Sequence, residues 1–361
     1  MKILVYLEKS DVRGGIEIFA ERHVARLRAE GHEVKMVSAI DKRQPTAGRQ
    51  SAIDFSAFDE VVVHKCSDVA TLEKFPPEKT VYYVHDHEPI CPRSYAYTPL
   101  KHNCTRPGGV WPCLFCAPLC RNWKGALRRV LSQSRRKRAM AGFRKLAVIS
   151  EFMKGRLVAN GIPAEKIVVE SPKIESLRVG IGSDRVADST PTLNDPTQTL
   201  NDPTQTLNDP NPTLNDPTQT LNDPNHAFVD LLYVGQLIRG KGVQLLLAAM
   251  ARMKTPRTLD IVGTGNMEPK LKALAAQLGI ADRVRFNGFQ SNPQDWMRAA
   301  KCVVVPSFWQ EPYGLVAAEA VALGRPVVAF AIGGLPEACG GKATLVPPGD
   351  IAALADALEL P

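Results

Sequence analysis

A seven-residue repeat close to TLNDPTQ occupies residues 190–225, near the middle of the 361-residue chain. Each repeat carries one leucine, and Asn-Asp-Pro follows it. The prolines remove backbone N–H donors and restrict the residues before them, and one leucine in seven cannot build a buried stripe, so a coiled coil is excluded. We interpret the segment as an extended linker or a string of Asx-type turns that separates two folded units.

Short apolar, β-rich runs alternate with helical patterns on both sides of this repeat. The predicted strands are Lys2–Leu7, Glu33–Ile40, Glu60–His64, Thr80–His85, Leu146–Ser150, Val229–Val234, Thr258–Val262, Val284–Phe286, Cys302–Pro306 and Pro326–Phe330. Such alternation is typical of βαβ crossovers in a parallel sheet. We therefore predict an α/β fold with two Rossmann-like domains that face a cleft. The domains span residues 1–176 and 228–361, and residues 177–227 form the linker.

Composition and charge limit the class of protein further. With 44% hydrophobic and 23% charged residues, the chain is neither disordered nor fibrous. No run reaches the roughly 18 apolar residues of a membrane span, and Glu8 and Lys9 interrupt the first run too early for a signal peptide. We expect a cytoplasmic protein that starts at Met1. Without the five Asp of the repeat, 45 basic residues face 32 acidic ones, which predicts anionic partners.

The segment Val303–Gly334 carries the strongest chemical pattern. A buried strand ends in a loop that contains Glu311, and Pro312 favours the start of a helix there. The free amides of Tyr313, Gly314 and Leu315 would then lie at its positive end, where an anion or a sugar hydroxyl can bind. Glu319, two turns into that helix, would place a second carboxylate toward the same cleft.

The Glu–seven residues–Glu spacing, its context EPYGLVAAEA and the later GRPVV and GGLPE resemble retaining glycosyltransferases of family 4, the group 1 glycosyltransferases. Their fold is GT-B. The resemblance implies transfer of a hexose from a UDP- or GDP-sugar to a hydroxyl acceptor, in polysaccharide or glycolipid assembly, without a required cofactor or metal. It also implies that Glu311 holds the transferring sugar, beside the cationic centre that forms, and that Glu319 accepts hydrogen bonds from the ribose.

The same resemblance implies further donor contacts on both domains. In Gly235–Gly242 (GQLIRGKG), Arg239 and Lys241 would bind the diphosphate, although Gln236 stands where the family usually has a basic residue. The remaining predicted donor contacts are Gly263 and Gly265 in IVGTG, Phe289 after Asn287-Gly288, and the glycine pair Gly14 and Gly15. His85, at a strand end, would contact the sugar or the acceptor.

Four cysteines in one stretch, Cys104, Cys113, Cys116 and Cys120, leave two interpretations open. They could ligate a structural zinc ion if the loop folds back, but the second half departs from the CxxC…CxxC pattern. The alternative is a set of free thiols in a long loop on the acceptor side. A third possibility is a metal site made by His85, His87 and Cys91.

Residues 121–145 contain ten Lys or Arg and no acidic residue. Leu127, Val130, Leu131 and Ser134 recur at helical spacing and are predicted to pack on the sheet. The basic face is either simply solvated or in contact with an anionic membrane surface, where each basic residue contributes about 1 kcal/mol. Such contact would place the protein on the inner face of the plasma membrane, near a lipid-linked saccharide acceptor. Nucleic acid is disfavoured, since no motif that reads bases accompanies the charge.

Two rival functions stay open at this stage. The first is an inactive or weak GT-B relative that acts as a binding module. Gln236 favours it, and so does the end of the chain at Pro361, soon after a predicted helix at Ile351–Leu358, because similar enzymes continue further. The second is a basic membrane-surface binding protein without chemistry, which would explain residues 121–145 but not the pair of glutamates.

Overall fold

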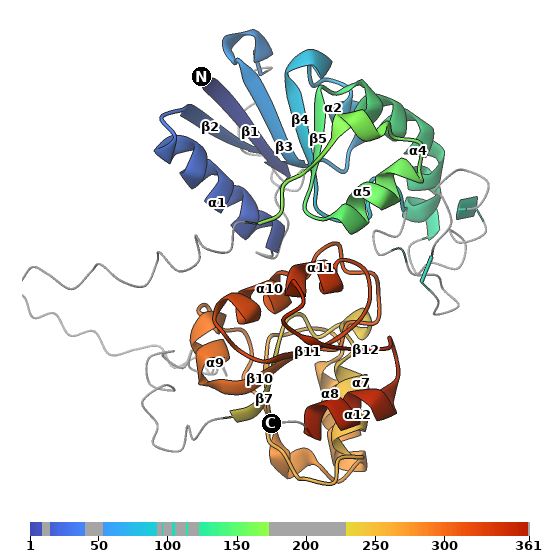
Figure 1. Cartoon of the computed structure of the whole chain (residues 1–361). Helices are drawn as coiled ribbons and strands as arrows, with labels where there is room; N and C mark the ends of the chain where they lie inside the picture. The colour runs from blue at the N-terminus through green and yellow to red at the C-terminus, as the bar shows by residue number, and fades with distance from the viewer. Residues whose placement is uncertain are drawn as a thin grey trace, which may run out of the picture.

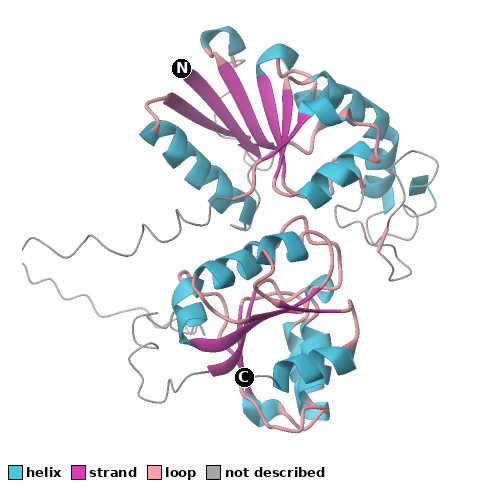
Figure 2. Ribbon diagram, viewed as in Figure 1, coloured by secondary structure: helices cyan, strands magenta, loops and turns pink. Residues whose placement is uncertain are grey.

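The computed structural model describes residues 1–8, 15–39, 53–91, 96, 103–104, 113–114, 123–172 and 229–359. These residues form two α/β domains, each built on a six-stranded sheet (Figures 1 and 2). The predicted α/β class with two Rossmann-like sheets is confirmed. The repeat at 190–225 lies outside the described residues, so the linker and its exact boundaries stay predictions. Among the described helices, none combines the length and apolar character that spanning a membrane requires.

The first domain contains a sheet in the order β2-β1-β3-β4-β5-β6, in which all neighbouring strands are parallel. Its strands are β1 Lys2–Glu8, β2 Glu33–Ala39, β3 Glu60–Lys65, β4 Thr80–Val84, β5 Lys145–Val148 and β6 Ile167–Val169, and its helices are α1 Gly15–Ala29, α2 Val69–Leu72, α4 Trp123–Gly142 and α5 Glu151–Val158. Every residue of β4 is buried, as expected where both faces of a parallel sheet are covered.

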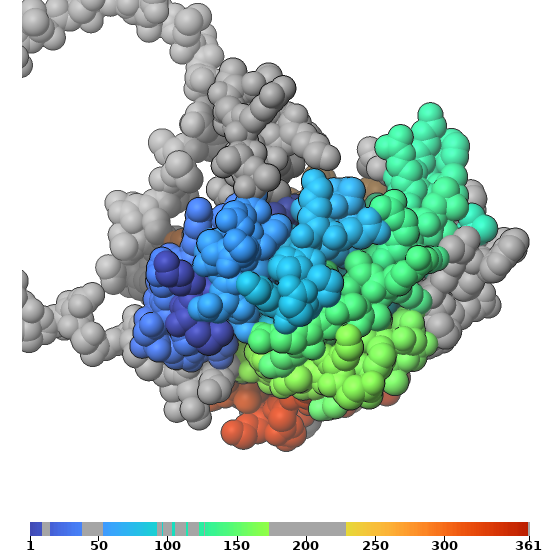
Figure 3. All heavy atoms as spheres, turned by 90° about the horizontal axis from the view of Figure 1, so that it is seen from above, coloured from blue at the N-terminus to red at the C-terminus, as the bar shows by residue number. Residues whose placement is uncertain are grey.

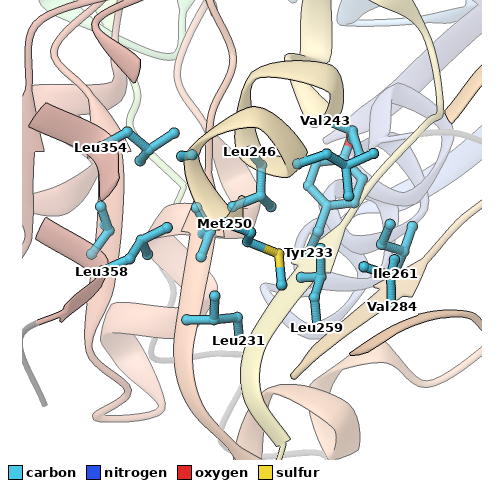
Figure 4. Close-up of a cluster of buried hydrophobic side chains, with 14 of the residues drawn as sticks. Leu231, Tyr233, Val243, Leu246, Met250, Leu259, Ile261, Val284, Leu354 and Leu358 are labelled. Carbon is cyan, nitrogen blue, oxygen red and sulfur yellow. The ribbon is translucent and has the colours of Figure 1, made fainter. Parts of the chain in front are cut away.

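The second domain contains a parallel sheet in the order β12-β11-β10-β7-β8-β9. Its strands are β7 Val229–Val234, β8 Leu259–Val262, β9 Val284–Phe286, β10 Ala300–Val305, β11 Val327–Phe330 and β12 Thr344–Val346, and its helices are α7 Val243–Met250, α8 Glu268–Gln277, α9 Pro293–Ala299, α10 Leu315–Ala322, α11 Leu335–Cys339 and α12 Ile351–Glu359. Figure 4 shows the core on one face of the sheet, where Leu246 and Met250 of α7 lie among Leu231, Leu354 and Leu358.

The strand order of the second sheet determines where a ligand can bind. The chain runs from β7 outward through β8 to β9 and then returns to β10 on the other side of β7. The loops after β7 and β10 therefore leave the carboxyl edge of the sheet in opposite directions. Ligands of open α/β sheets bind in the crevice at such a reversal. These two loops carry Lys241 and Glu311.

Two expected helix features differ from the structure. Helix α10 begins at Leu315 and not near Pro312, because Gly314 has a positive φ of 116° that does not continue into a helix. Glu319 consequently lies little more than one turn inside the helix. On α4, the buried side chains include Val130 and Met140, whereas Leu131 and Ser134 are exposed, so the predicted packing of those two residues is wrong.

Helices α10 and α11 form the face of the second domain nearest the first domain (Figure 1). A Cβ atom on Gly15, at the start of α1, would lie 3.4 Å from Leu315 Cδ1 at the start of α10. Ile149 of the first domain joins Tyr313 and Ala318 of the second in one buried apolar cluster. Seen from above, the blue and green residues of the first domain cover most of the second (Figure 3).

Candidate functional site

The Glu311 carboxylate lies in the loop after β10 and is 8% exposed. One of its oxygens, Oε1, accepts hydrogen bonds from Lys241 Nζ at 2.7 Å, Ser307 Oγ at 2.7 Å and Trp309 Nε1 at 2.8 Å. Burial alone would raise the pKa of Glu311, but the Lys241 charge and the three donors outweigh it and lower that pKa. The side chain is therefore a fixed carboxylate anion at neutral pH.

Glycines bring Lys241 to this carboxylate. Lys241 ends a short 3-10 turn, Arg239–Lys241, and Gly242 follows with a φ of 77°. A Cβ atom on Gly242 would lie 1.8 Å from the Pro306 carbonyl oxygen, and one on Gly240 would lie 2.4 Å from the Trp309 ring. Only glycine allows the loop after β7 to pack this closely on the loop after β10. The Lys241 ammonium also lies 5.5 Å from the centre of the Trp309 ring.

Arg239 and Gln236 belong to the same loop after β7. The Arg239 carbonyl accepts a hydrogen bond from Gln244 Nε2, and the Gln236 carbonyl accepts one from Tyr233 Oη. These bonds position the backbone of the loop. In this structure the ammonium of Lys241 contacts Glu311, so the two residues predicted to bind diphosphate and sugar are direct neighbours.

Glu319 lies on α10 and faces the first domain. Its carboxylate is 3.6 Å from Arg22 Nη1 of α1 and accepts a hydrogen bond from Gln294 Nε2 at 3.4 Å. Burial raises the pKa of Glu319, and the Arg22 and Gln294 contacts offset only part of that effect. The predicted ribose acceptor is thus held by a cation from the opposite domain.

The N-terminus of α10 has no side-chain cap. Gly314 occupies the cap position, and a Cβ atom there would lie 2.5 Å from Leu335 Cδ2 of α11. The first amides of the helix, which begins at Leu315, have no acceptor inside the helix, so the positive end of its dipole can bind an anion. The Tyr313 side chain is buried in the apolar cluster, so a ligand contact of Tyr313 would have to come from its backbone.

Gly263 and Gly265 have a packing role that sequence reasoning missed. A Cβ atom on Gly263 would lie 1.9 Å from the Gly235 carbonyl oxygen, and one on Gly265 would lie 2.4 Å from that of Leu237. Gly263 also donates its N–H to the Gly288 carbonyl at 2.7 Å. These contacts tie together the loops after β7, β8 and β9. The Phe289 ring, in the loop after β9, is 70% exposed.

His85 and His87 bring the end of β4 toward the Glu311 loop. His87 is 1% exposed and its Nε2 donates to the Gln310 carbonyl at 2.9 Å. His85 directly follows β4, and burial lowers its pKa to about 3. Its ring lies 5.0 Å from that of Phe19, which also packs on the apolar cluster between the domains. Sequence reasoning considered His87 only as a metal ligand and missed its contact with the second domain.

Two further contacts between the domains were not predicted. Ser150, the N-cap of α5, donates its hydroxyl to the Pro312 carbonyl. The Glu337 carboxylate of α11 accepts hydrogen bonds from the amides of Glu151 at 2.8 Å and Phe152 at 3.4 Å. The sequence signals were the serine that ends a predicted strand and the acid that ends GGLPE, but nothing in a single sequence indicates that the two segments meet.

Several predicted residues stay untested. Gly14, Cys116 and Cys120 lie outside the described residues. Cys91 and Cys104 are free thiols of intermediate exposure, and Cys113 is also of intermediate exposure. In the part of the chain that the structure describes, no group of three His, Cys, Asp or Glu side chains could hold a metal ion. The cysteine site stays a prediction because two of its residues are not described, whereas the alternative site of His85, His87 and Cys91 is not formed.

Comparison with known proteins adds evidence for the second domain. The family model described as "Glycosyl transferases group 1" matches residues 229–360. The D-inositol 3-phosphate glycosyltransferase of Streptomyces griseus is 43% identical over 121 residues, which are 30% of this chain and 25% of the relative. A glycosyltransferase of Methanocaldococcus jannaschii described as uncharacterized is 40% identical over 111 residues, 30% of this chain and 28% of the relative. The matched region thus spans about a quarter of the length of these relatives.

Solved structures resemble both domains together. HepE from Anabaena, solved in complex with UDP and glucose, has a TM-score of 0.59 at 18% identity and covers 99% of this chain and 89% of its own. A glycosyltransferase from Rickettsia africae has a TM-score of 0.64 at 16% identity, with 99% and 87% covered. WaaG, a glycosyltransferase involved in lipopolysaccharide biosynthesis, has a TM-score of 0.57 at 16% identity. The fold is GT-B, as the sequence predicted.

Proposed function

We propose that this protein is a retaining glycosyltransferase that moves a hexose from a nucleotide-diphosphate sugar to a hydroxyl acceptor. One observation carries the proposal: Glu311 and Lys241 meet at the strand-order reversal of the second sheet, where ligands of open α/β sheets bind. The match of residues 229–360 to group 1 glycosyl transferases and the GT-B fold support it.

The donor would bind mainly on the second domain. Lys241 and the uncapped start of α10 would neutralise the diphosphate, and Arg239 would assist from the same loop. Glu319 would exchange Arg22 for the two hydroxyls of the ribose. A UDP-sugar or a GDP-sugar fits this charge distribution, and the complex of HepE with UDP favours the first. No metal is needed if Lys241 and the helix terminus carry the compensating charge.

Glu311 would hold the hydroxyls of the transferring sugar. Its buried anionic carboxylate would stabilise the positive charge that develops at the anomeric carbon as the bond to the diphosphate breaks. His85 would supply a further polar contact to the sugar or the acceptor. The contacts that His87 and Ser150 make with the second domain would exclude water, which would otherwise hydrolyse the donor.

Ligand binding and turnover test the proposal. A panel of UDP-, GDP- and ADP-sugars is screened for thermal stabilisation, and hydrolysis of the stabilising donor is then followed. We expect one nucleotide to raise the melting temperature, and Glu311→Gln to lower hydrolysis at least about 100-fold. The control Asp282→Asn changes an exposed acid of the same domain and should leave both unchanged.

The same experiment separates the rival function. Binding of a donor without hydrolysis, and without transfer to any acceptor in a cell extract, would support the inactive binding module. Absence of binding by every nucleotide-sugar would contradict the proposal altogether.

We also propose that α4 contacts an anionic membrane surface and brings the enzyme to a lipid-linked saccharide. Exposed residues follow one face of the helix at spacings of four, three, four and three: Lys124, Arg128, Leu131, Arg135 and Arg138. Leu131 is 60% exposed, and Trp123, at the start of the helix, is 49% exposed. Cations interspersed with exposed apolar side chains are typical of helices that lie at a lipid interface.

Not every basic residue of 121–145 belongs to this face. Arg136 is 3% exposed and donates hydrogen bonds to the Cys66 and Ser67 carbonyls, so its role is structural. Arg135 is bound to Glu73. The charge available to lipid is therefore smaller than the count in the sequence.

Liposome binding tests the membrane contact. Replacing Arg128 and Arg138 by Gln removes two surface cations and should weaken binding to vesicles with 30% phosphatidylserine by about 10-fold or more, given about 1 kcal/mol per residue. Higher salt should weaken wild-type binding too. Lys301→Gln is a matched control, because it removes a cation from an exposed ion pair of the second domain. Equal binding of wild type and double variant would refute the contact.

A further inference from the structure

Three histidines of the first domain form a continuous hydrogen-bonded chain. His23 of α1 contacts His64 of β3 through Nδ1 and Nε2 at 3.0 Å, and His64 contacts His85 through Nδ1 and Nε2 at 2.9 Å. His64 is 1% exposed and His23 is 7% exposed. The sequence places these residues far apart, and only the strand order β1-β3-β4 with α1 above it brings them together.

Aromatic rings hold the chain in place. Tyr83 stacks on His64 with ring centres 4.7 Å apart, and its hydroxyl donates to Glu170 at 2.5 Å. The Phe19 ring packs edge-on against all three histidine rings, with ring centres 5.0 to 6.3 Å apart. The rings therefore cannot turn away from one another without disrupting the core.

All three rings are neutral at physiological pH. Burial is the main cause, and it lowers the pKa of His23 to about 4 and that of His85 to about 3. The charged groups near the two ends are Arg26 and Glu170 at His23 and Lys65 at His85. Since no ring takes up a second proton, each has one N–H donor and one acceptor nitrogen.

This count leaves two arrangements of protons. Each contact between rings needs one N–H and one bare nitrogen. If His85 donates to His64, then His64 donates to His23, and all three protons lie on Nε2. If His23 donates to His64, the order reverses and all three protons lie on Nδ1. A mixed arrangement leaves two N–H groups or two lone pairs facing each other, which is costly in a buried site.

We propose that His23 and His64 are positioning residues that fix the tautomer of His85, so that its Nδ1 offers either a donor or an acceptor and not a mixture of both. The coupling itself is a property of the three hydrogen-bonded histidines. Its use, the choice of which sugar or acceptor hydroxyl His85 can bind, rests on the proposed function. A partner that changes the proton at His23 Nε2 would also change what His85 presents, two hydrogen bonds away.

Nuclear magnetic resonance of ¹⁵N-histidine-labelled full-length protein tests this coupling. A single neutral tautomer gives two well-separated imidazole nitrogen resonances, whereas a mixture moves them together. We expect His23, His64 and His85 to share one tautomer, either all Nε2–H or all Nδ1–H. Different tautomers within the chain, or averaged resonances at all three rings, would overturn the proposal. The measurement needs neither donor nor acceptor, so its outcome is independent of whether the protein transfers sugar.

Two variants of His23 provide the second arm. His23→Phe keeps a ring against Tyr83 but removes the hydrogen bond, whereas the amide of His23→Asn can replace Nδ1. We expect the His85 nitrogen resonances to move toward the averaged position in the Phe variant and to stay near wild type in the Asn variant. Unchanged His85 resonances in a folded His23→Phe protein would refute the coupling. His32→Gln changes a histidine that is not one of the three hydrogen-bonded rings. It serves to assign the nitrogen resonances and as a control.

Discussion

At Glu311 a single carboxylate oxygen accepts three hydrogen bonds in a nearly dry site, and one of them comes from an ammonium. Removing Lys241 would leave a buried anion that only two neutral donors stabilise. The free energy lost in that way exceeds what a surface ion pair contributes. Stability and proposed chemistry are therefore coupled at this residue, because a donor that attracts Lys241 also changes the environment of Glu311.

We expect Lys241→Met to lower the free energy of unfolding by about 2–3 kcal/mol. In the double variant with Glu311→Gln the loss should be smaller than the sum of the single losses, by about 1–2 kcal/mol, since the two residues are in direct contact. Chemical denaturation measures both. Lys272→Met, which breaks an exposed pair with Glu268, should cost less than about 0.5 kcal/mol. Strict additivity of the two site substitutions would contradict the argument.

Buried histidines predict a loss of stability in mild acid. Burial lowers the pKa of His23 and His87 to about 4, that of His85 to about 3, and that of His64 well below its usual range. Between pH 6.5 and about 4 the unfolded chain binds protons that the folded chain does not, so stability falls as the pH drops. Asp86, whose pKa burial raises to about 6, and Glu319, whose pKa burial also raises, oppose this with one proton each.

Each of these histidines contributes up to about 1.4 kcal/mol per pH unit in that window. We expect denaturation experiments at pH 7, 6 and 5 to show a progressive decrease in the free energy of unfolding. His64→Phe, measured over the same range, should have a smaller slope. A wild-type stability that is constant from pH 7 to pH 5 would disprove this account.

Among the elements, two connections of the second domain, the loop after β8 and the turn after α8, depend on glycine for separate reasons. Gly263 has a φ of 138° and also lies against the Gly235 carbonyl, whereas Gly279 has a φ of 66° with open space around the missing side chain. The first glycine is required by backbone contact and conformation, the second by conformation alone. Comparing the two positions therefore separates the cost of a close backbone contact from the cost of a positive φ.

Alanine substitution measures that difference. We expect Gly279→Ala to cost about 1 kcal/mol, which is the price of a left-handed conformation for a residue with a Cβ. Gly263→Ala should cost about 3 kcal/mol or more, because the new Cβ would overlap the Gly235 carbonyl and separate the loops after β7 and β8. Thermal melts of the two variants and the wild type suffice. Equal losses would show that the close contact contributes nothing.

Sequence patterns predicted the long elements better than the short ones. All ten predicted strands are present within a few residues, but β6 and β12, each of only three residues, were not predicted. β9 is equally short and was predicted, so strands of this length show too weak a pattern to be found reliably. The buried face of α4 differs from the predicted apolar face, since Arg136 is buried where an apolar residue would be expected. Hydrogen bonds from Arg136 to two carbonyls satisfy its charge there, and no pattern of residue types reveals such partners.

On the scale of the whole molecule, a few polar contacts and one small apolar cluster join the two domains in the part of the chain that the structure describes. Glu337 of α11 accepts hydrogen bonds from the first amides of α5, and His87 donates to the carbonyl of Gln310. Interfaces of this polar kind usually permit relative domain motion. The alternation of strand and helix patterns predicted both domains, and the residues of Val303–Gly334 predicted the loop of Glu311. The contacts across the interface depend on how two separate sheets meet, which local sequence does not encode.

Removing the Glu337 carboxylate should loosen this junction. We expect Glu337→Ala to enlarge the radius of gyration measured by small-angle X-ray scattering, since the N-terminus of α5 loses its acceptor across the interface. The melting behaviour of each domain should change little. Asp282→Ala, an exposed acid on the second domain, provides the comparison. An unchanged scattering profile would show that Glu337 does not hold the domains together.

The contact between Arg22 and Glu319 bears on the order in which the two proposed substrates would bind. If the two ribose hydroxyls bind both oxygens of Glu319, as proposed, they would displace the Arg22 guanidinium, so nucleotide binding would break one contact between the domains. Arg22 is about half exposed and 3.6 Å away, so that attachment is easily broken. In that case the nucleotide would bind first and free the first domain to readjust around the second substrate, so the proposed function predicts an ordered sequence of binding.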